Sequence, residues 1–466
     1  MDALTSKRQL RQFEGVNFDF GGAEAKRLAN WLLVWIGLAN IAFVAMWAIG
    51  APPRAIPIVV AAVVGLLFRN SPAWLKFAAF GAVMAFSVLW FIAAVFNLAI
   101  TSLLYSLRFM IEIRPAQSVE YIAVAALLGA VSVAAWFAVK RDSSFSDWRA
   151  SLIAVGSALA LIGVDAWVTA DMRGHYERSP SVGAPFESAM AASDAERVAL
   201  AGNRNLAIIM VESLGVPTSN SEMKRLLFAG LETPVMQRRF ESTRGTSLYY
   251  NSTTAGEIRE LCGRWGEYHE LVSAGGDLSC LPGRMRQAGY STHAYHSFEG
   301  PFFDRATWYP GIGFDRTVFA KDMIKAGAEP CGGVFPGACD RDIPEQLARQ
   351  LKAETGPQFV YWLTVNSHLP VPTEANLKVD RCERVSGELA RDFPMICRQF
   401  ALWQDMEKAL AREVLQPGFP PTDFLIVGDH MPPYFETRHR REFAPDRVPW
   451  IHLRWRPDAD KATTAD

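Results

Sequence analysis

The feature that most constrains this chain is the uneven distribution of its apolar residues. From Trp31 to about Ala170 the sequence is almost continuously apolar, whereas the remainder alternates short apolar runs with turns and charged segments. A helix needs about 20 apolar residues to cross a bilayer core. The apolar part therefore predicts an N-terminal five-helix transmembrane bundle within residues 1–170, with helices at 29–49, 55–69, 73–98, 119–139 and 150–170.

Positive charges indicate how the predicted bundle is oriented. Most of the basic residues flank the first helix or fill the second and fourth loops, namely Lys7, Arg8, Arg11, Lys26, Arg27, Arg69, Lys76, Lys140, Arg141 and Arg149. Only Arg54, Arg108 and Arg114 lie in the opposite loops. Because cytoplasmic loops carry the excess of Lys and Arg, the N-terminus is predicted to be cytoplasmic. Five crossings then place the rest of the chain in the periplasm, anchored in a bacterial inner membrane.

Cysteine usage agrees with this location. The six cysteines all follow the apolar part, and their order suggests the local pairs 262–280, 331–339 and 382–397. Six cysteines allow 15 connectivities, so the sequence alone does not fix the pairing, and six buried thiols are the alternative. Disulfides need an oxidising compartment such as the periplasm.

Two connecting segments remain open to interpretation. Residues 171–203 are polar and rich in Ser, Pro and Ala, which predicts a linker with one short helix near 185–201 before a catalytic domain at 204–466. Residues 101–113 mix large apolar side chains with Arg108. They are either an amphipathic helix in the outer membrane interface or a plain loop.

The domain at 204–466 contains four apolar runs of strand length that each end in polar residues. Helical patterns separate these runs, which favours an α/β fold with a mostly parallel sheet whose ligands gather at the carboxyl ends of the strands. The runs, with the polar residues that follow each of them, are 206–211 with Glu212 and Ser213, 291–295 with His296, 359–365 with Asn366 and His368, and 424–427 with Asp429 and His430.

Glu212, Asp429 and His430 form a mixed carboxylate and imidazole set that suits one divalent metal ion, Zn²⁺ or Mn²⁺. Thr253 is a candidate for the fourth ligand and for a nucleophile, because it stands where a helix is predicted to start and a metal can activate a hydroxyl. The alternative for this segment is a plain N-cap, with Thr254 and Glu257 as a capping box.

These motifs resemble those of the sulfatase-like lipoteichoic-acid synthases and phosphoethanolamine transferases of the alkaline-phosphatase superfamily. The resemblance implies five membrane helices before an α/β alkaline-phosphatase/sulfatase-like domain. It also implies that Glu212, Thr253, Asp429 and His430 bind the metal, with Thr253 the nucleophile. His296 and Arg305, in the segment from His296 to Asp315, match residues that contact phosphate or glycerol in the phosphoglycerol-transferring branch, and His368 is expected to act near the reacting oxygens.

Two departures leave the branch open. Phe303 stands where the phosphoglycerol-transferring branch usually has tryptophan, and the segment Cys331–Arg341 looks more like the phosphoethanolamine transferases. The expected reaction is ping-pong transfer of a phosphoglycerol or phosphoethanolamine head group. The donor is a membrane phospholipid, the group passes through a phosphorylated Thr253 to an envelope glycan or lipid A hydroxyl, and diacylglycerol is released.

Three other functions are alternatives to this transferase. A membrane-tethered sulfatase or phosphodiesterase would release its product to water, but Ser252 lacks the pattern of a sulfatase nucleophile. A non-catalytic envelope-binding protein would not need the complete ligand set. A transporter is disfavoured because Asp165 is the clearest charge within the predicted helices. The net charge of −1 and the lack of a basic stripe exclude nucleic acid as an expected partner.

Overall fold

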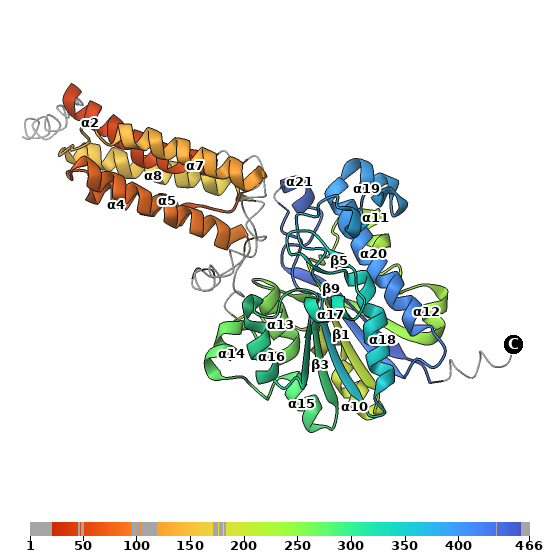
Figure 1. Cartoon of the computed structure of the whole chain (residues 1–466). Helices are drawn as coiled ribbons and strands as arrows, with labels where there is room; N and C mark the ends of the chain where they lie inside the picture. The colour runs from red at the N-terminus through yellow and green to blue at the C-terminus, as the bar shows by residue number, and fades with distance from the viewer. Residues whose placement is uncertain are drawn as a thin grey trace, which may run out of the picture. The chain divides into compact units, whose positions relative to one another are not determined.

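The computed structural model describes residues 21–44, 51–95, 119–170 and 183–457 except residue 435, with a few isolated positions between these ranges. The chain forms two compact units, which are considered separately (Figure 1). One contains the apolar helices before residue 170, and the other contains the α/β domain. The interfacial helix weighed for 101–113 lies, apart from Leu103, outside the described residues.

The first unit is a bundle of apolar helices. Its elements are α2 (Gly22–Leu32), the π-helical turn η2 (Leu33–Leu38), α3 (Ala39–Val44), α4 (Ala55–Leu67), α5 (Ala73–Val95), α7 (Val119–Ala138) and α8 (Trp148–Val168). Among the described residues, three continuous segments are long and apolar enough to cross a membrane, namely Gly22–Val44, Ala73–Val95 and Trp148–Val168. Helix α4 and the described apolar part of α7 are shorter. The count of five crossings therefore stays a prediction.

The buried acid of this unit has local partners. Asp165 on α8 accepts hydrogen bonds from the backbone N–H of Arg54 at 2.8 Å and from Trp47 Nε1 at 3.1 Å. Since Arg54 is the N-cap residue of α4, the carboxylate joins the end of one helix to the start of another. Asp165 therefore has a structural role between the apolar helices.

The second unit is built on a seven-stranded sheet with the order β2-β9-β8-β1-β7-β3-β4. Strands β8, β1, β7, β3 and β4 are parallel to one another. At one edge β9 runs antiparallel to β8, and β2 runs antiparallel to β9, so β2 has the same direction as the parallel strands. The strands are β1 (Asn205–Val211), β2 (Phe240–Leu248), β3 (Ser291–His296), β4 (Arg316–Phe319), β7 (Gln358–Leu363), β8 (Thr422–Gly428) and β9 (Arg447–Trp455). The four predicted strands and the mostly parallel sheet are confirmed, and β2, β4 and β9 are additional.

Helices cover both faces of this sheet and bury two separate cores. Successive side chains of β1 point to opposite faces, so Ile209 joins one core and Ile208 the other. The first core is covered by α11 (Ser221–Leu226), α12 (Pro234–Arg239), α17 (Ala320–Lys325), α18 (Ile343–Ala353), α19 (Gly387–Asp392) and α20 (Pro394–Val414). The second is covered by α10 (Ala195–Gly202), α13 (Thr253–Cys262), α14 (Tyr268–Ala274), α15 (Leu281–Gln287) and α16 (Arg305–Gly311).

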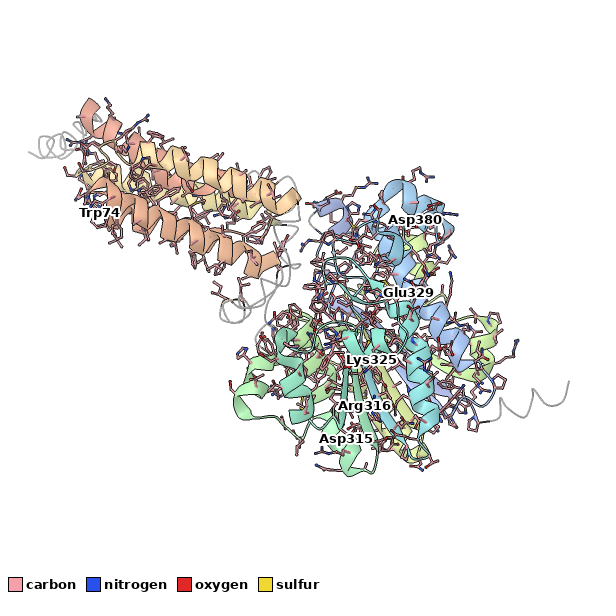
Figure 2. All side chains as sticks on the ribbon, viewed as in Figure 1. Trp74, Asp315, Arg316, Lys325, Glu329 and Asp380 are labelled. Carbon is pink, nitrogen blue, oxygen red and sulfur yellow. A yellow bond between two sulfur atoms is a disulfide. The ribbon has the colours of Figure 1, made fainter. Side chains whose placement is uncertain are left out.

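Figure 2 helps to orient the sheet. Asp315 and Arg316 lie at the amino end of β4, and Glu329 lies toward the opposite end of the sheet. The polar residues that follow the parallel strands belong to this opposite, carboxyl edge.

All three predicted disulfides are confirmed: Cys262–Cys280, Cys331–Cys339 and Cys382–Cys397. The first joins the end of α13 to the residue before α15, and the second closes the small hairpin of β5 (Pro330–Cys331) and β6 (Gly337–Ala338). The linker differs from the single predicted helix. It forms α9 (Ala189–Ser193) and α10, because the left-handed backbone of Asp194 (φ 57°) interrupts the helix between them.

Candidate active site

Sheet topology brings three of the predicted metal ligands together. Strands β1 and β8 are parallel neighbours in which Val211 pairs with Gly428, so the residues that follow them leave the sheet side by side. Glu212 follows β1, while Asp429 and His430 follow β8. One ligand atom from each of these three residues lies within 4.8 Å of the others.

The helix that begins at Thr253 supplies the fourth member of the cluster. Thr253 Oγ1 lies 3.3 Å from Glu212 Oε2 and 3.3 Å from His430 Nε2. The capping-box interpretation of this segment is wrong. The N-cap residue of α13 is Ser252, no side chain caps the helix, and Glu257 is bonded elsewhere. The Thr253 hydroxyl is therefore directed at the cluster.

The cluster suits a divalent cation. Asp429 Oδ1 accepts hydrogen bonds from the N–H groups of Ser213 (2.8 Å) and His430 (2.6 Å), whereas Asp429 Oδ2 is buried without a hydrogen-bond partner. Burial, followed by the nearby Glu212 carboxylate, raises the pKa of Asp429 to about 7. A bound cation would relieve both effects. Carboxylate, hydroxyl and imidazole donors fit Zn²⁺ or Mn²⁺.

The imidazole of His430 is oriented by the backbone of the next residue, Met431. Its Nδ1 lies 2.8 Å from the carbonyl oxygen of Met431, which leaves Nε2 facing Glu212 and Thr253. Burial lowers the pKa of His430, but the Asp429 and Glu212 carboxylates outweigh it and raise the pKa above its ordinary value.

Two residues with left-handed backbone lie close to the predicted site residues. Ser213, directly after Glu212, and Asn251, two residues before Thr253, have left-handed φ angles of 55° and 71°. Such conformations are costly for residues other than glycine, and they cluster at functional sites. In this domain they turn the chain sharply just where a metal ligand and the candidate nucleophile must face each other.

Sequence reasoning missed a buried relay behind the metal ligands. Arg259 donates hydrogen bonds from Nη2 to the carbonyl oxygen of Gly428 (2.8 Å) and from Nη1 to that of Asp429 (3.2 Å). Its Nε donates a hydrogen bond to Glu260 Oε1 at 2.7 Å. Glu260 in turn accepts hydrogen bonds from the N–H groups of Ala189 and Met190 at the start of α9. The relay thus connects the linker helix to the loop that carries two ligands.

His368 lies beyond the carboxyl end of β7, as predicted. Its Nδ1 is 2.8 Å from the carbonyl oxygen of Leu369, and its ring packs edge-on against Phe335 with centroids 4.5 Å apart. The preceding residue, Ser367, donates a hydrogen bond to the backbone oxygen of Glu212 at 2.6 Å. Burial, with a further effect from His430, lowers the pKa of His368 to about 4, so the imidazole is neutral at physiological pH.

Arg305 and His296 occupy a neighbouring buried region. Arg305 donates to Glu257 Oε2 from Nη2 (2.7 Å) and Nε (3.0 Å), so its guanidinium is engaged inside the fold. His296 Nδ1 lies 3.4 Å from the carbonyl oxygen of Leu363, and its Nε2 is buried without a partner. Burial and the positive charge of Arg305 hold the pKa of His296 well below its usual range. Within the described contacts, neither residue hydrogen-bonds Glu212, Thr253, Asp429 or His430.

Parts of this chain are similar to known proteins. Residues 204–410 match the sulfatase family model, in agreement with the sulfatase-like motifs of this part of the sequence. A stretch of 160 residues is 26% identical to a putative cyclic beta-1,2-glucan modification protein of Rhizobium meliloti (strain 1021). That match covers 32% of this chain and 23% of the relative, so the chain spans about a quarter of the relative's length.

Two of the solved structures that resemble this chain are enzymes of low sequence identity. The lipoteichoic acid synthase LtaP from Listeria monocytogenes is 16% identical, with 55% of this chain and 66% of that chain covered and a TM-score of 0.42. The Streptococcus pyogenes phosphoglycerol transferase GacH, in complex with sn-glycerol-1-phosphate, is 16% identical, with 56% and 73% covered and a TM-score of 0.39.

Proposed function

We propose that this protein is a membrane-anchored transferase that moves a phosphate-bearing head group from a membrane phospholipid to a glycan of the bacterial envelope. The observation that carries the proposal is the position of Thr253. Its hydroxyl lies 3.3 Å from both Glu212 and His430 at the start of a helix, within a sulfatase-family domain that follows apolar helices. A hydroxyl in this position is suited to attack phosphorus, and the N-terminus of α13 favours the anion that results.

The reaction follows from the groups around Thr253. A divalent ion held by Glu212, Thr253, Asp429 and His430 would lower the pKa of the hydroxyl and polarise a phosphoryl oxygen. Thr253 Oγ1 gives up its proton and forms a bond to phosphorus while the bond from phosphorus to the diacylglycerol oxygen breaks, and that oxygen takes up the proton. In the second step the oxygen of an acceptor hydroxyl forms a bond to phosphorus while the bond from phosphorus to Thr253 Oγ1 breaks, and the proton of the acceptor hydroxyl passes to Thr253 Oγ1. Neutral His368 is available as the proton acceptor.

Donor and acceptor are proposed on different grounds. Anchoring by apolar helices keeps the enzyme in the same membrane as a phospholipid donor, either phosphatidylglycerol or phosphatidylethanolamine. A glycan acceptor is favoured over lipid A because the 26% identical relative is described as a putative modifier of cyclic β-1,2-glucan. The proposed location is the inner membrane, with the catalytic domain in the periplasm, where the three disulfides would be stable.

The test is to incubate the purified full chain, loaded with Zn²⁺ or Mn²⁺, with labelled phosphatidylglycerol or phosphatidylethanolamine. We expect diacylglycerol to be released from one donor and a labelled phosphate to be found on Thr253 by mass spectrometry. Addition of cyclic β-1,2-glucan should remove that label. Release of the head-group phosphate into water at the same rate with and without glucan would instead indicate a hydrolase.

A further inference from the structure

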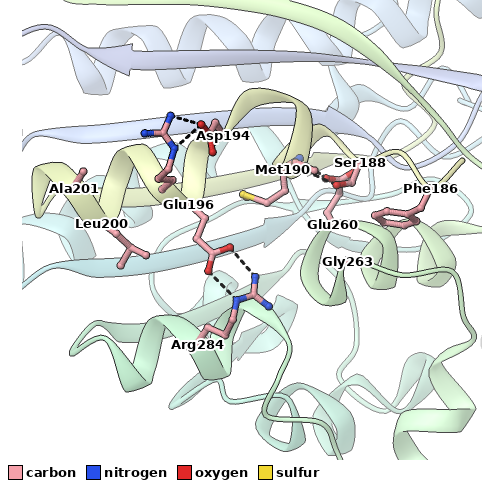
Figure 3. A pocket seen from close by; sticks show the side chains of 12 residues that line it. Phe186, Ser188, Met190, Asp194, Glu196, Leu200, Ala201, Glu260, Gly263 and Arg284 are labelled. Carbon is pink, nitrogen blue, oxygen red and sulfur yellow. Dashed lines mark hydrogen bonds and ion pairs between the residues drawn. The ribbon is translucent and has the colours of Figure 1, made fainter.

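The domain contains an open groove of about 820 Å³ between α10, the end of α13 and α15 (Figure 3). Its volume falls within the range of about 300–1,000 Å³ that is typical of small-molecule sites. Glu260 and Gly263 line one side of the groove, seven and ten residues after Thr253 on and just beyond α13. At 1.5 Å per helical residue they lie about 10–15 Å along the helix from Thr253.

The charged groups of the groove are paired with one another. Arg284 binds Glu196 through two hydrogen bonds of 2.8 and 2.7 Å, and Arg197 Nε binds Asp194 at 2.6 Å. Glu260 is paired with Arg259 behind the groove. Each of the five charged residues that line the groove therefore has an ion-pair partner, and the partly exposed Glu196–Arg284 pair can still bond a ligand. Such a surface is complementary to a neutral, polyhydroxylated ligand and does not select a strongly charged one.

Aromatic rings lead from the groove toward the candidate nucleophile. Phe186 lies at one end of the groove and is 37% exposed. Its ring packs edge-on against Trp265 with centroids 5.0 Å apart, and Trp265 packs against Tyr250 at 5.2 Å. Tyr250 precedes Thr253 by three residues. A sugar ring presents a face of C–H groups that packs on an aromatic ring and a rim of hydroxyls that binds polar side chains.

We propose that this groove binds the acceptor as a neutral oligosaccharide. Its sugars would pack on Phe186 and hydrogen-bond the Glu196–Arg284 pair, while a hydroxyl farther along the chain reaches Thr253. The disulfide Cys262–Cys280 holds α13 and α15 together, so the groove keeps a fixed distance from the nucleophile. This inference rests on the proposed function for the reaction, but glycan binding itself can be measured without turnover.

The first test is calorimetric binding of cyclic β-1,2-glucan, and separately of a linear glucose oligosaccharide, to the full chain in detergent. The variants are Phe186→Ala and Arg284→Gln, and the matched control is Ile324→Ala, since Ile324 is similarly exposed at 36% on the other face of the sheet. Wild-type protein and the control should bind at least one of the glycans equally well. Each groove variant should bind about three- to tenfold more weakly. Absence of binding to both glycans, or equal binding by all four proteins, would overturn the proposal that the groove binds an oligosaccharide.

Two further measurements separate this inference from the proposed function. In the transfer reaction, Phe186→Ala should raise KM for glucan without an equal rise in KM for the phospholipid. If wild-type protein binds glucan through the groove but releases no diacylglycerol from either donor, the groove stands and the transferase assignment fails. If the groove variants instead raise KM for the phospholipid and leave glucan binding unchanged, the groove serves a lipid and the glycan inference is wrong.

Discussion

Two buried acidic clusters lie close to α13, and they differ in how completely their charges are satisfied. Both oxygens of Glu257 are occupied, Oε2 by two bonds from Arg305 and Oε1 by the hydroxyls of Tyr309 and Tyr361. Asp429 is equally buried, yet its Oδ2 has no hydrogen-bond partner and the Glu212 carboxylate is a neighbour of the same charge.

The contrast distinguishes a buried charge that is fully paired from one that is not, and the second belongs to the proposed site. A buried ion is costly unless partners replace its water, and the protein provides those partners around Glu257. Around Asp429 it provides hydrogen-bond donors for Oδ1 only, and the charged group nearest to Oδ2 is the imidazole of His430, with Nε2 at 3.4 Å. The incomplete cluster is the one that reaches the Thr253 hydroxyl, which is where a metal ion and a phosphate would bring the missing partners.

The largest effect is expected at the nucleophile. Thr253→Ala should lower transfer by about 10³-fold or more, because Thr253 Oγ1 is the hydroxyl that lies 3.3 Å from both Glu212 and His430. Rates of diacylglycerol release and the melting temperature would both be measured, with Ser252→Ala as the control from the adjacent position. Near-normal activity of the Thr253 variant, with metal bound, would move the nucleophile elsewhere.

Substitution of one acid in each cluster tests the comparison directly. Glu257→Gln should destabilise the protein by about 3–5 kcal/mol, because the buried Arg305 loses its counter-charge. Asp429→Asn should leave the stability of the metal-free protein unchanged or higher, because it removes repulsion with Glu212 and keeps a carbonyl oxygen for Ser213. Thermal unfolding with a chelator present measures both. A larger loss of stability for Asp429→Asn than for Glu257→Gln would contradict the comparison of the two acids.

Substitution of Arg259 sharpens the comparison. This residue contacts the loop that carries Asp429 and His430 but is not itself a predicted metal ligand. Arg259→Lys removes the planar fork that binds the carbonyl oxygens of Gly428 and Asp429, and should weaken metal binding about 10- to 100-fold. Metal titration by calorimetry gives the affinity, and Arg264→Lys, at a partly exposed position just after α13, is the control. Unchanged affinity with an unchanged melting temperature would show that the fork is dispensable.

The smallest effect is expected from a third buried acid, Glu407, and it concerns how the stability of the protein depends on pH. Burial raises the pKa of Glu407 on α20 to about 8. Because this value is above that of the unfolded chain, the folded state holds the proton more tightly, and the stability gained below about pH 4.5 is lost as pH rises toward 8. Between pH 6 and 8, wild-type protein should lose about 1 kcal/mol per pH unit more than Glu407→Gln. Parallel pH profiles of unfolding would contradict this assignment.

Much of the site could be predicted because it depends on local patterns. Apolar strands that end in Glu212, in His368 and in Asp429–His430 are visible in the sequence, and parallel pairing brings their ends to one edge. Strand β2 was not visible, because it is an edge strand with mostly polar residues that gains its partner from β9 at the far end of the chain.

The roles of charged residues within helices were also not predictable. Arg259 and Glu260 look like ordinary surface charges, and only the folded chain shows that they are buried against Gly428 and the start of α9. Arg305 was expected to face the substrate, whereas in the structure its guanidinium binds Glu257. Which partner a long side chain selects depends on tertiary contacts that have no fixed spacing in sequence.

The pairing of Val211 with Gly428 has a consequence for folding itself. If β1 and β8 paired one residue out of register, the side chains of one strand would exchange faces, and Glu212 and Asp429 could not share an ion. A metal ion would therefore stabilise only the correct alignment, by about 2.7 kcal/mol when its free concentration is a hundred times its Kd. The ion that takes part in the reaction would therefore also select the correct register of β1 and β8.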